Sequence, residues 1–289
     1  MTQIIKPPQF CRRNPDSHKG TYGTAFMICG SYGMAGAAVL AARGALKSGV
    51  GLCVCTLPSA IYPIAAQSVP EAVFVPVGSR HSKRFSVFSG RAIKKRLKTA
   101  SAVLIGCGLS QSRGNLHVLS QVIKNSRCPL IIDADGINML SRNINLLSRA
   151  KSPVILTPHP KEMSALTNKS ISEIQQDREG IARDFAVKHG VYLVLKGNKT
   201  VVAHPDGSVY INETGNAGMA TGGSGDVLSG IAVSLCAQYK DTGKAINDAV
   251  YIHGLSGDFA ARKFSQISML PQDIINELPC VFKSLSAAD

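Results

Sequence analysis

A single carboxylate lies inside a glycine-rich run in the last third of the chain. The run, from Asn216 to Gly230, precedes an apolar segment, Ile231 to Cys236. Glycines let a phosphate approach the backbone, and the first N–H groups of a helix have no internal partner, so they point at anions. We therefore expect a phosphate or anion loop made of Gly222, Gly223 and Ser224, with Gly225 beside it.

Asp226 is the residue of this run that can do acid–base chemistry. A carboxylate beside a phosphate site repels the ligand unless it takes a proton from a hydroxyl that is being phosphorylated, or holds a metal ion. This layout indicates kinase-like phosphoryl transfer. A glycine turn with Asp226 as a helix cap explains the same residues equally well, because Asp is among the preferred cap residues.

Two further segments place polar side chains directly after short apolar runs. Thr157-Pro158-His159-Pro160 holds a histidine between two prolines, and a rigid ligand contact or a structural turn would both explain it. Lys196-Gly197-Asn198-Lys199-Thr200 offers ammonium and hydroxyl groups that could face phosphates. If the apolar runs are strands of one parallel sheet, both segments reach the edge where ligands collect.

Several common motifs do not occur. Gly30, Gly33 and Gly36 follow an apolar run, as do Gly106 and Gly108, but neither spacing is GxGxxG, so a nicotinamide-binding fingerprint is unsupported. The sequence has no GxxxxGK[ST], which excludes a P-loop NTPase. It also has no GxSxG and no HExxH, so ordinary serine hydrolases and zincins are unsupported.

The elements that must position these residues follow an α/β pattern. Apolar runs alternate with helical segments from Thr24 onward, which is typical of βαβ units in a parallel sheet. The expected strands and helices are, in chain order, Ala25–Cys29, helix Met34–Lys47, Leu52–Leu57, Val73–Val77, helix Phe85–Lys98, Ala102–Ile105, helix Leu116–Lys124, Leu130–Asp133 and Val154–Leu156.

The last part of the chain adds hairpins and helices. Ser170 to Glu173 is a capping box that opens a helix reaching Lys188. Turn residues at Gly197-Asn198 and at Pro205-Asp206-Gly207 then separate three short strands, so part of the sheet is expected to be antiparallel. The remaining helices are expected at Ile231–Gln238, Ala245–Arg262 and Gln272–Leu278.

Composition predicts one catalytic domain over residues 21–289 behind a basic arm over residues 1–20, because no linker or repeat interrupts the 289 residues. No apolar run approaches the roughly 18 residues that span a bilayer, and the first residues lack the apolar core of a secretion signal. The eight cysteines form no CxxC and mostly lie in apolar runs, so we expect reduced core thiols. A cytoplasmic protein without a membrane partner is expected.

The formal net charge of +14 is concentrated in one segment. No residue from Gly78 to Ala100 is acidic, whereas this stretch carries eight Lys and Arg residues between Arg80 and Lys98. Such a run can bind nucleic acid, form a solvated helix face, or attract polyanionic substrates. A nucleic-acid partner is disfavoured, because the chain has no Trp and only Phe85 and Phe88 lie nearby.

Several blocks together resemble the ADP/ATP-dependent NAD(P)H-hydrate dehydratase family of the ribokinase-like superfamily. They occur in the family's order and cover the chain from about Ser17 to about Leu278. The blocks are His18-Lys19-Gly20, Gly30 to Ala37, Asp133-Ala134-Asp135, Asn138, Leu156 to Met163, Lys196-Gly197 and Gly218 to Gly230. The chain departs from the family's usual Gly-Pro-Gly-Leu-Gly at Cys107 and Ser110, and at Lys161, which is often Gly.

The resemblance implies a ribokinase-like three-layer α/β/α sandwich with a mostly parallel sheet and an antiparallel hairpin region. It also implies a free-standing dehydratase without the epimerase half, a homo-tetramer, and Mg²⁺ whose protein ligands the sequence does not identify. Residues matching the family's adenosine phosphate site are Lys196, Gly197, Asn198, Lys199, Thr200 and Gly225. Those matching its hydrated-cofactor site are Ala37, Gly108, His159 and Asp226.

The main hypothesis is ADP-dependent dehydration of the S epimer of hydrated NADH or NADPH. The ring hydroxyl is phosphorylated and phosphate is then lost, which leaves AMP. One alternative is an ATP-dependent kinase of the same superfamily acting on a vitamin-like alcohol, for which the glycine loop and Asp226 would serve equally well. Another is a nucleotide- or nucleic-acid-binding protein that uses the segment Arg80 to Lys98. The choices of ADP or ATP and of NADH or NADPH hydrate stay open.

Overall fold

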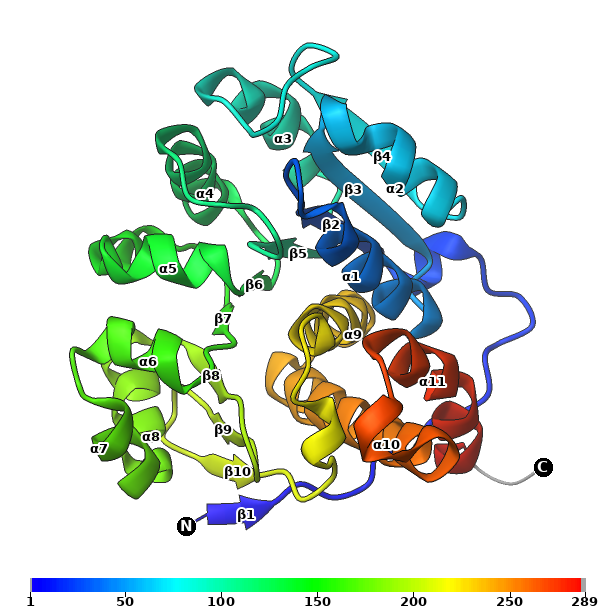
Figure 1. The fold of residues 1–289 in the computed structure, drawn as a ribbon, viewed down its shortest axis with the longest axis vertical. Helices are drawn as coiled ribbons and strands as arrows, with labels where there is room; N and C mark the ends of the chain where they lie inside the picture. Colours follow the sequence, from blue (N-terminus) through cyan, green and yellow to red (C-terminus); the bar gives the residue numbers. More distant parts are fainter. Residues whose placement is uncertain (1, 287–289) are drawn as a thin grey trace.

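A ten-stranded sheet runs through the centre of the protein. The structure is a computed structural model that describes residues 2–286, so residues 287–289 of the expected domain lie outside the described part. The strand order is β1-β10-β9-β8-β7-β6-β5-β2-β3-β4 (Figure 1). The strands are β1 Thr2–Ile4, β2 Thr24–Ile28, β3 Leu52–Pro58, β4 Val73–Val77, β5 Ala102–Ile105, β6 Leu130–Ile132, β7 Val154–Leu156, β8 Tyr192–Leu195, β9 Val201–Ala203 and β10 Val209–Ile211.

Most of the sheet is parallel, and one region is antiparallel. Strands β2 to β8 pair with one another in parallel, whereas β9 runs antiparallel to both β8 and β10. Val202 of β9 lies opposite Val194 on one side and Tyr210 on the other. The hairpins predicted from the two turn signals are therefore confirmed.

Helices cover both faces of the sheet. In Figure 1, α3 to α8 lie on one face, and α1, α9, α10 and α11 lie on the other. The predicted three-layer α/β/α sandwich is confirmed, and within residues 2–286 no helix has the length and apolarity needed to cross a membrane. The helices are α1 Ala35–Lys47, α2 Tyr62–Ser68, α3 Gly90–Leu97, α4 Arg113–Asn125, α5 Asp135–Ser141, α6 Pro160–Thr167, α7 Ile171–Gln176, α8 Arg178–His189, α9 Ser224–Gln238, α10 Thr242–Ser268 and α11 Pro271–Leu285.

Two apolar cores result from the alternation of side chains along the strands. Phe26 and Val54 point to the core shared with α3 to α8, while their neighbours Ala25 and Cys53 point to the core shared with α1 and α9. Because both faces of the central strands are buried, they consist of nearly continuous apolar residues. This explains why short apolar runs were sufficient to locate them.

Close packing of α1 against α9 fixes the helix that carries the glycine run. A Cβ at Gly230 would lie 2.2 Å from the carbonyl oxygen of Ala41, and one at Gly44 would lie 2.9 Å from that of Val227. Only hydrogen fits at these distances, so the two helix backbones come unusually close. This contact holds the amino end of α9 at the carboxyl edge of the sheet.

The residues of the expected basic arm take part in the sheet. Thr2–Ile4 forms β1, which pairs in parallel with β10, and the backbone N–H of Ile5 donates to the carbonyl of Ile211 at 2.9 Å. Farther along, Phe10 forms an isolated parallel bridge with Ser286. The segment therefore runs along the strand edge and beside α11.

Several local expectations were wrong. The helix predicted from the capping box to Lys188 is split, because Asp177 leaves the helical conformation to end α7 and then caps α8, accepting from the N–H of Gly180 at 2.9 Å. The helix predicted from Phe85 begins only at Gly90, after a short 3-10 turn. The eight cysteines are free thiols as expected, but Cys11 and Cys280 are exposed rather than in the core.

Candidate active site

A cavity of about 960 Å³ lies where β6, β7 and β8 end beside the amino end of α9. Each strand delivers one polar residue to it, Asp133 after β6, His159 after β7 and Lys196 after β8. Parallel strands end at the same edge of a sheet, so residues far apart in sequence meet there. Asp226 reaches the same cavity from the first turn of α9.

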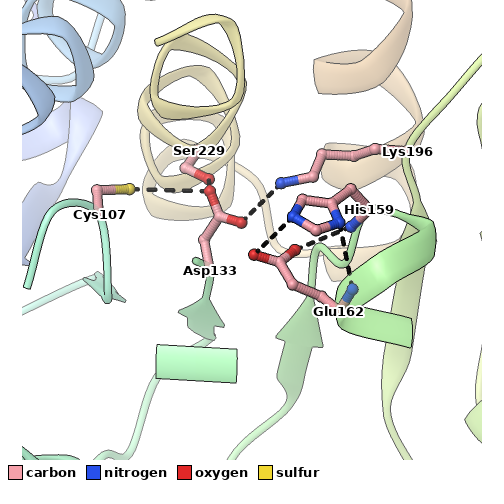
Figure 2. A network of polar contacts seen from close by, with 6 residues as sticks. All are labelled: Cys107, Asp133, His159, Glu162, Lys196 and Ser229. Carbon is pink, nitrogen blue, oxygen red and sulfur yellow. Dashed lines mark hydrogen bonds and ion pairs between the residues drawn. The ribbon is translucent and has the colours of Figure 1, made fainter. Parts of the chain in front are cut away.

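A buried ion pair forms the floor of the cavity. The Lys196 Nζ lies 2.8 Å from the Asp133 Oδ1, and the Ser229 hydroxyl donates to the Asp133 Oδ2 at 2.7 Å (Figure 2). Burial would raise the pKa of Asp133, but the Lys196 charge and the hydrogen bonds from Lys196 and Ser229 lower it below its ordinary value. The Asp133 carboxylate is therefore ionised, and it keeps the Lys196 ammonium charged and fixed.

Asp226 has an environment suited to a general base. Burial, followed by the neighbouring Asp133 charge, raises the pKa of Asp226 to about 6, although a hydrogen bond from Cys107 and the Lys196 charge oppose the rise. A base with a pKa close to neutral accepts protons efficiently at physiological pH while remaining mostly ionised. The interpretation of Asp226 as the helix cap is wrong, because Gly223 occupies the N-cap of α9 and Asp226 lies three residues farther on.

The loop after β8 has a backbone shaped by its glycine and lysine. Gly197 has φ +146° and Lys199 has φ +53°, and the Thr200 hydroxyl donates to the carbonyl of Gly197 at 3.0 Å. Arg178 holds the start of the loop by donating to the carbonyl of Leu195 at 2.8 Å. The loop is thereby fixed on the cavity wall.

The glycine run passes next to the ion pair. A Cβ at Gly225 would lie 3.3 Å from the Lys196 Nζ. Gly223 has φ +102°, a conformation that L side chains rarely adopt, and a Cβ there would lie 2.6 Å from Leu40. The first N–H groups of α9 therefore face the cavity near a lysine ammonium, which is the arrangement that binds phosphate.

His159 both caps a helix and lines the cavity. Its Nδ1 accepts from the N–H of Glu162 at 3.2 Å, and its own N–H donates to the Glu162 Oε2 at 2.9 Å. Its Nε2 lies 3.4 Å from the other carboxylate oxygen of Glu162. Burial and the Lys196 charge lower the pKa of His159, so its imidazole is neutral at physiological pH. Burial raises the pKa of Glu162 to about 7.

Helix α10 holds the loop that leads into the glycine run. The two oxygens of Asp258 each accept at 2.9 Å, one from the N–H of Gly215 and the other from the Asn216 side chain. Farther along, the His253 Nε2 lies 3.4 Å from the Ser224 hydroxyl, and burial lowers the pKa of His253 to about 4, which keeps the imidazole neutral. These contacts tie both ends of the loop to one helix.

The structure brings most of the predicted site residues to this one cavity. Ala37, Gly108 and Gly222 are the exceptions and lie outside its lining. A Cβ at Gly108 would lie 2.7 Å from that of Ala37, so these two residues lie against each other, one in the first turn of α1 and the other after β5. The lining includes the predicted Lys196, Gly197, Asn198, Lys199, Thr200, His159, Gly223, Ser224, Gly225 and Asp226.

The backbone next to Gly108 is left-handed although Ser replaces Gly at position 110. Ser110 has φ +61°, and its N–H donates to the Asp135 Oδ2 at 2.7 Å. The Asn115 side chain donates to the Ser110 carbonyl at 2.8 Å. These hydrogen bonds offset the steric cost of the left-handed conformation, which glycine would not incur.

Reasoning from sequence missed several residues of the site. Glu162 stands three residues after His159, which is capping-box spacing, so that spacing was a usable signal. Asp133 was placed at the end of a strand and in a block that carries the family resemblance, but it was given no role in the site. His253 and Asp258 lie within a long helix, and nothing in their spacing marks them before the loop is seen packed against it.

Comparison with known proteins identifies relatives of the chain. A family model described as NAD(P)H-hydrate dehydratase matches residues 25–280. A bifunctional NAD(P)H-hydrate repair enzyme of Moorella thermoacetica is 38% identical over 96% of this chain, which spans about half (52%) of that enzyme. An ADP-dependent (S)-NAD(P)H-hydrate dehydratase of Bacillus subtilis is 34% identical over 94% of this chain and 93% of its own length.

Solved structures agree with the sequence relatives. A Bacillus subtilis ADP/ATP-dependent NAD(P)H-hydrate dehydratase, co-crystallised with ATP and Mg²⁺, matches with a TM-score of 0.82 at 33% identity, covering 96% of this chain and 95% of the other. A ribokinase-like superfamily protein of Enterococcus faecalis matches with a TM-score of 0.85 at 28% identity, covering 99% and 96%. With its ribokinase-like fold and its match over residues 25–280, the chain belongs to the NAD(P)H-hydrate dehydratase family.

Proposed function

We propose that the protein is an ADP-dependent dehydratase acting on the S epimer of hydrated NADH and NADPH. One observation carries the proposal: Asp226, with a pKa of about 6, shares a cavity with the Lys196 ammonium and the amino end of α9. A base, a cation and free N–H groups are the three components that phosphoryl transfer to a hydroxyl requires. The Bacillus subtilis relative named for this reaction supports the choice of substrate.

In the first step Asp226 accepts the proton of the ring hydroxyl, while the hydroxyl oxygen attacks the terminal phosphorus of ADP. The bond between that phosphorus and the bridging oxygen breaks, and AMP leaves. The N–H groups of Gly223 and Gly225 and the Lys196 ammonium stabilise the charge that spreads over the transferring oxygens. Asp133 acts through Lys196, because it orients the ammonium and is itself fully engaged.

In the second step the phosphate ester leaves the ring. The ring nitrogen pushes its electron pair toward the carbon that bears the ester, the carbon–oxygen bond breaks, and a proton is lost from the neighbouring carbon. The products are the reduced cofactor and phosphate. After phosphorylation the protein need supply little beyond orientation.

A Mg²⁺ ion carried by the nucleotide fits the oxygen donors of the cavity. Asp133, Asp226 and Cys107 lie close enough together to form a cluster. However, Asp133 is engaged by Lys196 and Ser229. The Cys107 thiol stays protonated, because a hydrogen bond with Cys29 and the burial of the thiol raise its pKa. The other carboxylates that line the cavity are Glu162 and Glu213, and either would hold the ion together with the phosphates and water. When bound, Mg²⁺ would neutralise phosphate charge.

The test is recovery of the reduced nicotinamide absorbance from hydrated NADH and NADPH, with ADP and ATP supplied side by side. We expect turnover with stoichiometric release of AMP and phosphate from ADP, and its loss in Asp226→Asn with nucleotide binding retained. If a stable phosphorylated alcohol accumulated and no absorbance returned, the protein would be a kinase instead. Full activity in Asp226→Asn would show that Asp226 is not the base.

The same proposal includes a cytoplasmic location and a homo-tetramer. Eight free thiols fit a reducing compartment. The tetramer is expected from the family resemblance alone. Light scattering of the purified chain would measure the mass directly, and a monomer at micromolar concentration would contradict this part of the proposal.

A further inference from the structure

An exposed aromatic ring lies on the turn that follows β2. Tyr32 is 62% exposed although its neighbours in the turn are Gly30, Ser31 and Gly33. Its N–H donates to the carbonyl of Lys83 at 3.0 Å, and the Lys83 ammonium lies 4.7 Å from the centre of its ring. The ring is therefore held in place from one side, while most of its surface faces solvent.

The cation beside this ring belongs to a loop that is fixed at the same edge of the sheet. The loop follows β4, and the N–H of Ala60, after β3, donates to the Ser82 carbonyl at 3.2 Å. Arg80, Lys83 and Arg84 are all exposed in it, and the stretch from Gly78 to Ala100 contains no acidic residue. A fixed cluster of exposed cations attracts a phosphate that carries two charges.

A series of contacts connects the proposed catalytic base to the turn that carries this ring. The Cys107 thiol lies within 4.8 Å of the Asp226 carboxylate, the Cys107 carbonyl accepts from the N–H of Gly30 at 2.8 Å, and the Ser31 hydroxyl donates to the carbonyl of Gly108 at 2.9 Å. These residues therefore lie next to one another, from Asp226 past the ends of β5 and β2 to Tyr32. A dinucleotide is long enough to need a second anchor away from the reacting ring.

We propose that Tyr32 stacks on the adenine of the hydrated cofactor and that Lys83, supported by Arg80 and Arg84, binds the 2′-phosphate. The protein would then prefer hydrated NADPH to hydrated NADH, because that phosphate is the only group by which the two substrates differ. Every base offers a face for stacking on an aromatic ring, so Tyr32 serves both substrates. The inference rests on the proposed function and names the substrate class of the same site.

The test replaces Lys83 by Met, which keeps the aliphatic stem over Tyr32 and removes the charge. We expect kcat/KM for hydrated NADPH to fall roughly five- to tenfold, which suits a contact that is partly exposed to water, and kcat/KM for hydrated NADH to stay unchanged. The matched control is Lys94→Met, the same change on the exposed face of α3. An equal loss of kcat/KM for hydrated NADPH in the control would mean that the positive charge of the segment attracts the substrate generally, and that Lys83 does not bind the 2′-phosphate. An equal loss for both hydrates, or none for either, would overturn the assignment.

The ring is tested separately. Tyr32→Ala should raise KM for both hydrates while leaving kcat largely intact, and Tyr32→Phe should retain the wild-type KM, because stacking needs the ring and not the hydroxyl. Titration calorimetry with NADP⁺ and NAD⁺ provides a readout without turnover. Preferential, Lys83-dependent binding of NADP⁺ by a protein that dehydrates neither hydrate would contradict the proposed function and leave this site standing. Equal affinity for NADP⁺ and NAD⁺ would overturn the site alone.

Discussion

Replacing Asp226 by Asn should abolish turnover and stabilise the fold at the same time. The carboxylate lies beside the ionised Asp133 and is largely buried, so its charged form is disfavoured in the folded protein. Asn has nearly the same shape and does not ionise. We expect kcat to fall by at least about 10²-fold, the contribution typical of a general base, while the free energy of unfolding rises.

The size of the stability gain follows from the pKa. A rise from 3.8 to about 6 is roughly two units, or about 3 kcal/mol, and the opening of the cavity to water should reduce the measured value to about 2 kcal/mol. Because the folded-state pKa lies above the unfolded one, ionisation costs stability. This cost is small near pH 4, grows as the pH rises toward 6, and is complete above about pH 7. The free energy of unfolding of the variant should therefore exceed that of the wild type by the largest amount at pH 8.

Urea unfolding at pH 4, 6 and 8 measures this difference directly. The control is Asp16→Asn at an exposed position, which should change the free energy of unfolding little at any pH. A stability gain that did not depend on pH would refute the electrostatic reasoning. A loss of stability at pH 8 would mean that the ionised Asp226 carboxylate stabilises the folded protein rather than destabilising it.

Three further predictions concern the same site and its frame. The pH profile of kcat/KM should fall on the acidic side with an apparent pKa near 6, because Asp226 must be ionised to accept a proton; activity that persists unchanged at pH 5 would contradict this. Lys196→Met should destabilise the protein by about 3 kcal/mol in urea unfolding, since it leaves the Asp133 charge buried and alone, and adding Asp133→Asn should recover part of that loss. Ser110→Gly should stabilise the fold by about 0.5 kcal/mol by removing left-handed strain, and a clear loss in thermal unfolding would show that the Ser110 side chain matters more than its backbone.

The sequence located most elements because their signals are local. Val73–Val77 was predicted with its observed bounds, since an apolar strand needs no partner to be recognised. The break at Asp177 was missed because two short helices on one buried face show the same periodicity as one long helix. The start of α9 was placed too late because glycines lower helix propensity, whereas packing against α1 requires them there.

By itself, the sequence determined which chemical groups are available. The glycine run with Asp226, the lysine loop and the histidine between prolines are local patterns, and each predicted a site residue without knowledge of the others. Only the tertiary structure decided that Asp133 binds Lys196 across 63 positions of sequence, and that α10 holds the loop through Asp258. The pKa of Asp226 depends on burial and on that neighbouring charge, neither of which is encoded next to it in the chain. Through-space electrostatics is set by the fold, and it makes this carboxylate a candidate base rather than a cap.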